Sequence, residues 1–486
     1  MRYCTIIMLM LLWGSGNAGD QNSGVSLSIT DLQSERTLNI MLKDEEVEIV
    51  VPSNDEITKL HEEAIEDRTG EAAFELASLY YEGNGVSKNI NEATKWYQLS
   101  ADRGFAKSQY NLGLILVIKK DFKNALKWLR MAADQSLPAA FNALGVMHDE
   151  GLGVEKNDIT AIFWYQKAVD QGFILANYNL ALVYYEGHGV AQSYTKAIEY
   201  FTKASEQGLA EAQFNLGFIY KKGQGVAPDL SQAVKWYQEA AEQGLAEAQN
   251  NLGAMYIQGQ GVDLDLSKAI DMFEKAAAQN DPGAQTNLGV IYQKGLGVAQ
   301  DFLEAAKWYE KAANQGDKVA QNNLGVMYEV GEGVEEDFSK AFKLFKKAAD
   351  KGLVQAQYNL GMLHKDTYYL WKKDPLGYSE LNKYFDLTVE HFKKAAEKGH
   401  VESLYNLGLI YEEVNELEKS AYWYEQAANL EHGLSQYKIG IAYYTGDGVD
   451  KDKEKGKSWL IKAEEQGNDR AIEALRKIRD WELSHQ

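Results

Sequence analysis

The 486-residue sequence has almost no cysteine and little proline. Its one cysteine, Cys4, lies in the apolar start of the chain, so the rest can form no disulfide and offers no thiol for catalysis or metal binding. Five prolines stand against 42 glycines. This balance is typical of many short helices that each end at a glycine.

The sequence also lacks a basic character, an Asn-X-Ser/Thr sequon and a long apolar run after its first residues. Its net charge is −21 and its acidic residues are spread along the chain, so phosphate backbones and anionic membranes would be repelled. No later stretch approaches the roughly 20 apolar residues that a membrane helix needs. We therefore expect no nucleic-acid partner and no integral membrane segment.

The first eighteen residues have the pattern of a secretory signal peptide. Arg2 precedes an apolar run from Cys4 to Trp13, and the small residues Gly16 and Ala18 mark a cleavage site. The run is too short to span a bilayer, and the alternative is a buried N-terminal helix. Residues 1–18 therefore predict export to a periplasm or the cell exterior, and the missing sequons favour a bacterial envelope over a eukaryotic lumen.

A repeat runs through the rest of the chain, marked by a leucine or isoleucine followed by a small residue. Most of these pairs lie 36 residues apart, with two spacings of 32 and one of 47. The leading residues are Leu76, Leu112, Leu144, Leu180, Leu216, Leu252, Leu288, Leu324, Leu360, Leu407 and Ile439. Such a period is typical of helical repeats that bury their faces only by stacking on neighbours.

One unit shows how the repeat builds two helices. Residues 210–222 place apolar side chains four apart around Leu216, which predicts a first helix, and Gly217 leaves room for a partner helix. Two glycines and a valine then end this helix and turn the chain. Asp229 or Ser231 can cap a second helix, whose inward residues are Ala233, Trp236, Tyr237, Ala240 and Ala241.

The ends of the chain differ from the regular repeat. Residues 54–70 resemble a lone second helix, and residues 471–486 a final first helix, so both are expected to cap the repeats of 71–470. Residues 19–53 lie outside the repeat. They predict either a disordered tail or a small hairpin able to pair with a partner.

The motifs A-x-A-Q-x-N-L-G-x-x-Y, G-x-G-V and A-x-x-W-Y-x-x-A-A-x-x-G recur over roughly residues 54–482. They resemble the Sel-one-like repeat family, which is related to the tetratricopeptide repeat. The resemblance implies an all-α, right-handed solenoid of about eleven repeats that binds proteins or peptides, in bacterial members often in the envelope or against host cells. Some members are labelled β-lactamases, but those tend to carry a disulfide in each repeat, and this chain has none.

If the tetratricopeptide-like alignment holds, the residue before each leucine faces a concave groove. That residue is Asn111, Asn179, Asn215, Asn251, Asn287, Asn323, Asn359 and Asn406. An amide can donate and accept one hydrogen bond each toward a peptide backbone, so these residues form a candidate binding ladder. The alternative is that each asparagine ties neighbouring helices together.

The repeat is interrupted near residues 366–386, where eleven residues are gained. This insertion is rich in aromatic residues: Tyr368, Tyr369, Trp371, Tyr378 and Tyr384. Aromatic side chains on a rigid scaffold are typical of binding hot spots. The alternative is a degenerate repeat that packs these side chains on its neighbours.

Motifs for catalysis are weak. Ser193-x-x-Lys196 and Ser435-x-x-Lys438 match a short β-lactamase motif without its Lys-Thr-Gly companion, and the histidines have no metal spacing. We expect no enzyme, cofactor or metal, and a chain compatible with a monomer. The sequence predicts an envelope or secreted adaptor, with a host-binding factor and, less well supported, a cell-wall hydrolase or β-lactamase as alternatives.

Overall fold

A computed structural model describes residues 52–373 and 378–484, and these residues form 24 helices without a strand. The all-α prediction is therefore confirmed. The predicted signal peptide and nearly all of the 19–53 extension lie outside the described residues. The helices belong to two compact units, and the boundary falls at Ala277, within α15.

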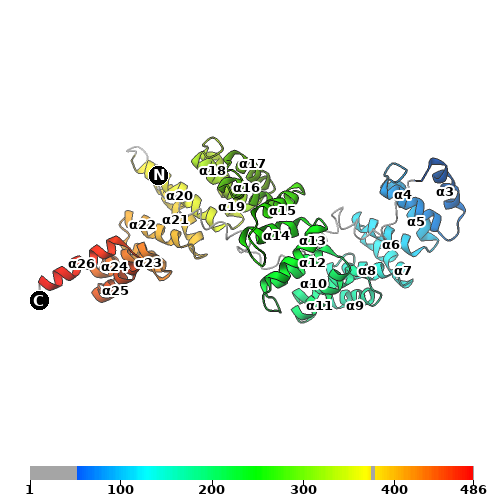
Figure 1. Ribbon diagram of the computed structural model, residues 1–486, viewed down its shortest axis with the longest axis horizontal. Helices are drawn as coiled ribbons and strands as arrows, with labels where there is room; N and C mark the ends of the chain where they lie inside the picture. The colour runs from blue at the N-terminus through cyan, green and yellow to red at the C-terminus, as the bar shows by residue number, and fades with distance from the viewer. Residues whose placement is uncertain (1–51, 374–377, 485–486) are drawn as a thin grey trace. The chain divides into compact units, whose positions relative to one another are not determined.

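The first unit holds the helices up to α15 (Figure 1). They are α3 (Asn54–Glu66), α4 (Glu71–Glu82), α5 (Ile90–Asp102), α6 (Ala106–Ile118), α7 (Phe122–Asp134), α8 (Pro138–Glu150), α9 (Asp158–Val169), α10 (Ile174–Glu186), α11 (Tyr194–Glu206), α12 (Ala210–Lys222), α13 (Leu230–Glu242), α14 (Ala246–Gln258) and α15 (Leu266–Ala278).

The second unit holds the remaining helices. They are α16 (Pro282–Lys294), α17 (Phe302–Asn314), α18 (Lys318–Val330), α19 (Phe338–Asp350), α20 (Val354–Lys372), α21 (Tyr378–Ala396), α22 (Val401–Glu413), α23 (Leu417–Asn429), α24 (Gly433–Thr445), α25 (Lys453–Glu465) and α26 (Asp469–Ser484). In both units helices alternate between the first of a repeat, called helix A, and the second, called helix B.

Close packing of helix A on helix B depends on the glycine after each leucine. A Cβ atom added to Gly217 would lie 2.7 Å from Cδ1 of Tyr237, which is fully buried on helix B. That distance is well inside van der Waals contact, so a larger residue would push the two helices apart. The expected close approach is therefore confirmed, and it recurs in both units.

The loop between the two helices also follows the sequence pattern. Gly223 and Gly225 have φ angles of +70° and +74°, a left-handed conformation that favours glycine. Asp229 caps α13, because its side chain accepts a hydrogen bond from the Gln232 amide at 3.0 Å. Of the two candidate caps, Asp229 is therefore the one used.

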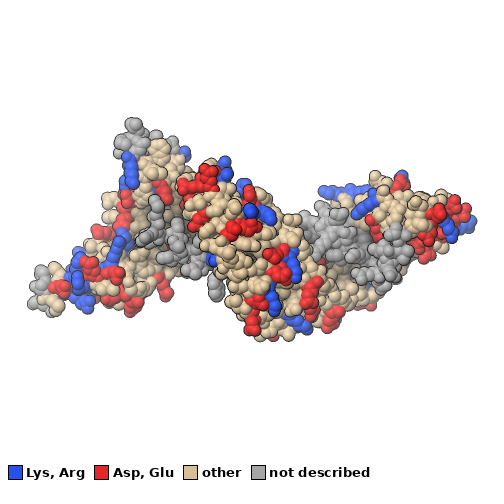
Figure 2. Space-filling model, turned by 45° about the horizontal axis from the view of Figure 1, so that its top comes forward, with Lys and Arg blue, Asp and Glu red and all other residues tan. Residues whose placement is uncertain are grey.

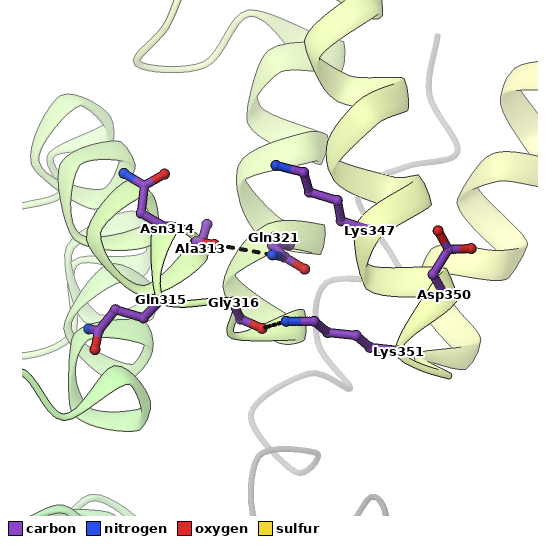
Figure 3. A pocket seen from close by; sticks show the side chains of 8 residues that line it. All are labelled: Ala313, Asn314, Gln315, Gly316, Gln321, Lys347, Asp350 and Lys351. Atoms are coloured by element: carbon purple, nitrogen blue, oxygen red, sulfur yellow. Dashed lines mark hydrogen bonds between the residues drawn. The ribbon is translucent and has the colours of Figure 1, made fainter.

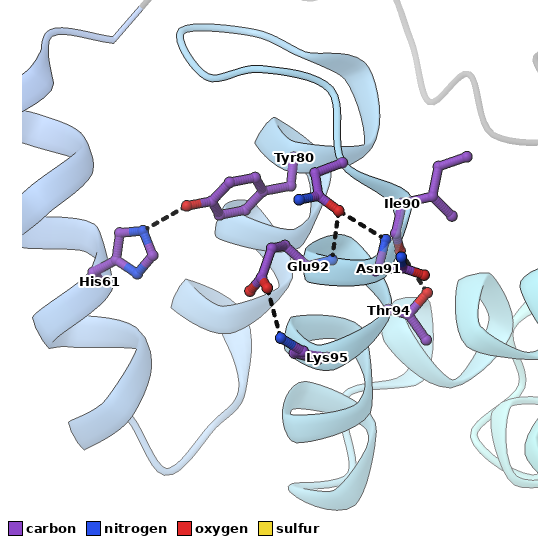
Figure 4. A network of polar contacts seen from close by, with 8 residues as sticks. His61, Tyr80, Ile90, Asn91, Glu92, Thr94 and Lys95 are labelled. Atoms are coloured by element: carbon purple, nitrogen blue, oxygen red, sulfur yellow. Dashed lines mark hydrogen bonds and ion pairs between the residues drawn. The ribbon is translucent and has the colours of Figure 1, made fainter.

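Helix α3 covers the first complete repeat. Its His61 ring forms a hydrogen bond with the Tyr80 hydroxyl at 3.1 Å (Figure 4). The same ring lies edge-on to Trp96. Arg103, at the end of α5, donates to the Ala64 and Ile65 carbonyls at the open end of α3. The arginine thus supplies donors to carbonyls in the last turn of α3, which have no partner within the helix. In the described residues no repeat precedes α3.

Helix α26 packs at the other end of the second unit. Leu475 and Ile478 are buried with Leu460 of α25 in one apolar cluster. Among the described helices, none is long and apolar enough to cross a membrane.

Candidate partner-binding surfaces

The predicted asparagine ladder is largely engaged within the scaffold. In three cases the amide of one helix A donates to a side chain on the helix A of the preceding repeat. These bonds are Asn179 to Asn142 (2.8 Å), Asn215 to the Tyr178 hydroxyl (3.3 Å) and Asn359 to Asn322 (2.9 Å). Each bond links successive repeats, which is the alternative role that the sequence left open.

The other five asparagines are buried or half-buried. Asn251 donates to the Glu247 carbonyl on its own helix at 2.9 Å. Asn406 is 7% exposed and accepts a hydrogen bond from Lys365 at 2.6 Å. Asn323 is buried, and Asn111 and Asn287 are half-buried. A peptide that used the amides of Asn251 or Asn406 would have to compete with bonds inside the solenoid.

The described part of the aromatic insertion is helical and lengthens α20 and α21. Helices α20 and α21 have 19 residues each, against 12 or 13 in the regular repeats. Tyr368 is 3% exposed and packs on Phe385, which in turn contacts Tyr411 of α22. Tyr368 and Phe385 therefore pack within the scaffold and against the next repeat.

The other predicted residues of the insertion lie nearer the surface. Tyr369, Trp371 and Tyr384 are half-buried, and nothing is described of the Tyr378 side chain. An ion pair between Lys372 and Glu413 fixes the end of α20 to α22. The insertion thus presents three partly exposed aromatic side chains on a docked helix pair.

A set of half-buried charged residues on helix A was not foreseen from the sequence. Glu329 and Lys365 each lie five residues after the leucine of their repeat. Burial raises the pKa of Glu329 to about 7, and the neighbouring Asp366 carboxylate adds to the shift. Burial likewise lowers the pKa of Lys365. In the sequence, these residues could have been recognised because both occupy the same position of the repeat.

The sequence pattern also did not predict a series of paired glutamines, which we call the glutamine ladder. In each pair, a glutamine at the end of helix B donates to the side-chain oxygen of a glutamine on helix A. The pairs are Gln135 to Gln109 (2.8 Å), Gln243 to Gln213 (2.7 Å), Gln315 to Gln285 (2.8 Å) and Gln466 to Gln436 (3.0 Å). Gln213 also donates to the Ser205 carbonyl of the preceding helix B, so one side chain joins three helices.

A hollow of about 470 Å³ lies where α17, α18 and α19 meet (Figure 3). It is lined by Ala313, Asn314, Gln315, Gly316, Gln321, Lys347, Asp350 and Lys351. Two lysines and several amides give it a polar wall. Such a wall suits a ligand that forms hydrogen bonds and carries negative charge.

The serine motifs that matched a β-lactamase pattern have structural roles. Ser193 caps α11 and accepts a hydrogen bond from the Lys196 amide at 3.4 Å. Ser435 is fully buried and bonds the His432 ring, whose Nδ1 caps α24. In the part of the chain that the structure describes, no three histidine, cysteine or acidic residues are grouped to hold a metal.

On the face of the molecule shown in Figure 2, charged side chains do not form large areas of one sign. Acidic and basic residues are interspersed over the visible face (Figure 2). Many form pairs along one helix, such as Lys275 with Asp271 and Lys394 with Glu390, both four residues apart. The negative net charge is therefore distributed, and local positive sites such as the hollow can exist within it.

The comparisons with known proteins agree with this architecture. The Sel1 repeat family matches residues 70–105, 106–137, 138–173, 174–209, 210–245, 246–281, 282–317, 318–353, 354–369, 385–400, 401–432 and 433–468. The segments 354–369 and 385–400 overlap the two ends of the aromatic insertion, whose middle is not matched. A search of curated proteins gave no match.

The solved structures that are similar to this chain include two bacterial repeat proteins. One is a protective antigen of uropathogenic Escherichia coli strains with the SLR fold, at 30% identity and a TM-score of 0.68, covering 88% of this chain and 90% of that one. The other is a Sel1 repeat protein of Oxalobacter formigenes, at 34% identity and a TM-score of 0.48, covering 67% of this chain and 93% of that one. Sel1 repeat proteins are generally protein-interaction scaffolds, and this chain belongs to the Sel1 repeat family.

Proposed function

We propose that this chain is an exported, non-catalytic scaffold that binds a partner protein or peptide in a bacterial envelope or outside the cell. The proposal rests on the observation that the polar residues of the candidate motifs serve the fold, by capping helices or joining them. The serines of the candidate catalytic motifs cap or support helices, three asparagines link successive repeats, and the glutamines join the helices of one repeat and, at Gln213, the preceding repeat. The remaining surface of stacked helices is suited to binding.

The exported location is supported by the signal-peptide pattern of residues 1–18 and by one relative. A protective antigen is a protein that an immune system meets, and the Escherichia coli protein of that description is 30% identical over most of this chain. The same description favours a second candidate, a factor that binds host proteins. Cell fractionation separates the two, because an envelope adaptor stays in the periplasm and a host-binding factor reaches the medium.

Affinity capture from envelope and medium extracts tests the scaffold function. The chain without residues 1–18 is compared with a variant carrying Asn→Ala at 215, 251, 287 and 323, after circular dichroism shows that the variant is folded. A partner lost only with the asparagines places recognition in the groove. A partner kept by the variant directs attention to the insertion and the hollow. Failure of both proteins to enrich any partner contradicts the proposal.

A further inference from the structure

The glutamine ladder is broken in two successive repeats of the second unit. The glutamine at the end of helix B is replaced by Lys351 opposite Gln321, and by Lys398 opposite Gln357. Neither lysine bonds the facing glutamine. Each donates instead to a glycine carbonyl in the preceding loop.

The breaks leave two buried acceptors without a partner. Among the described residues, neither Gln321 Oε1 nor Gln357 Oε1 receives a hydrogen bond, although the side chains are only 3% and 8% exposed. Such an acceptor costs about 1–3 kcal/mol, and native proteins rarely keep one without a reason. Other buried atoms of the described residues also lack a partner, among them oxygens of Asn177 and Glu247, but at Gln321 and Gln357 the facing glutamine is replaced by a lysine.

The acceptor of Gln321 points into the hollow. Its Nε2 donates to the Ala313 carbonyl at 3.1 Å, and its oxygen is turned toward the lysines of α19 (Figure 3). Asp350, the one acidic residue of the lining, pairs with Lys346 at 3.2 Å. In the described part of the chain, Lys347 and Lys351 therefore have no carboxylate partner.

We propose that the hollow between α17, α18 and α19 binds an acidic peptide segment of a partner. A carboxylate of the peptide lies between Lys347 and Lys351, and a peptide N–H donates to Gln321 Oε1. This inference rests on the proposed scaffold function and names the chemistry that it recognises.

Several observations favour a peptide over other anions. A simple inorganic anion without a proton offers no donor to Gln321 Oε1, whereas a peptide carries a carboxylate and an N–H close together. The exposed amide of Asn314 at the rim can bond the peptide backbone. A long nucleic acid would meet a chain of net charge −21 around a small positive site. The second break, at Gln357 and Lys398, lies one repeat further along and can receive a second acidic residue of the same segment.

The test is fluorescence anisotropy with a fluorescein-labelled hexaglutamate peptide that has blocked termini. The full chain without residues 1–18 is compared with Lys347→Gln and Lys351→Gln. The second variant restores the residue found in the intact repeats, so its fold is retained. The matched control is Lys311→Gln, which occupies the same position of helix B as Lys347 in the neighbouring repeat, where the ladder is intact.

We expect saturable binding that weakens about tenfold in each hollow variant and stays within about twofold in the control. Equal weakening in all three variants would mean that charge alone attracts the peptide, which overturns the site. Equal competition by free sodium glutamate overturns the peptide assignment in favour of a small carboxylate. If the peptide does not bind but the captured partner still does, the hollow is wrong and the scaffold function stands.

Discussion

Gln243 donates from its Nε2 to the Oε1 of Gln213 across 2.7 Å, and Gln213 in turn donates to the Ser205 carbonyl. This chain of two bonds joins α11, α12 and the end of α13. In a solenoid each repeat contacts only its neighbours, so such bonds between successive helices carry much of the polar stabilisation.

Removal of a donor from the ladder should destabilise the chain. Gln243→Ala leaves Gln213 Oε1 buried without its partner, so we expect a loss of about 1–2 kcal/mol in the free energy of unfolding. Urea denaturation followed by circular dichroism measures it. Gln207→Ala is the control, because its facing acceptor at Asn177 is already unpaired and little should change.

Restoring the missing glutamine of the ladder should stabilise the chain. Lys351→Gln supplies the missing donor to Gln321, and we expect a gain of about 1 kcal/mol together with slower amide exchange in α18. Hydrogen exchange followed by mass spectrometry reads this region directly. Unchanged exchange and unchanged stability would show that the broken ladder costs the native chain nothing.

The asparagines should differ in their contribution to stability. Asn215 links its helix to Tyr178 of the preceding repeat, whereas Asn251 donates to the Glu247 carbonyl within α14. We expect Asn215→Ala to lose about 1–2 kcal/mol and Asn251→Ala clearly less. Similar values for the two variants would contradict a role in joining repeats at Asn215.

The glycine beside each leucine should not tolerate a side chain. In Gly217→Ala the new Cβ would meet the Tyr237 ring at 2.7 Å, and we expect a loss of about 1–3 kcal/mol despite the better helix propensity of alanine. Thermal unfolding compares it with Ser231→Ala, an exposed position at the start of α13. A stabilised Gly217→Ala would show that α12 and α13 can separate without cost.

Stability should fall as the pH rises through the titration of Glu329. Its pKa is raised from 4.5 to about 7, so the folded chain binds the proton more tightly than the unfolded chain. The stabilisation is complete below about pH 4.5 and lost by about pH 7. We therefore expect the free energy of unfolding of Glu329→Gln to exceed that of the wild type by about 2 kcal/mol at pH 8, and by little at pH 4.5.

The pH dependence is measured by urea denaturation across this range. Glu332→Gln is the control, since this glutamate lies in the loop after α18 and its substitution removes the same charge from the same repeat. A pH profile that Glu329→Gln leaves unchanged would contradict burial of the carboxylate.

The regular repeats were predictable because their signals are local. The leucine-glycine pair sets the register of helix A, and the two loop glycines end that helix wherever they occur. At the insertion those glycines are missing after Leu360, so the helix continues: His364 and Tyr368 extend the buried face at four-residue spacing to the end of α20. For these aromatic residues the sequence left two interpretations open, a binding surface and packing on the neighbouring repeats, and buried Tyr368 follows the second.

The glutamine ladder was not predicted because each bond joins residues 26 or 30 positions apart. A glutamine after helix B is expected to be solvated, and only the geometry of the helix end brings it to helix A. The substitution of Lys351 and Lys398 at that position is visible in the sequence, but it becomes informative only once the facing glutamines are known to be buried.

We propose that the solenoid surface recognises a partner protein. Hydrogen exchange of the chain with and without the partner recovered by capture tests it most directly. We expect added protection in one contiguous area that includes the end of α17, the start of α18 and the end of α19. Exchange that is unchanged throughout the described repeats would contradict the claim.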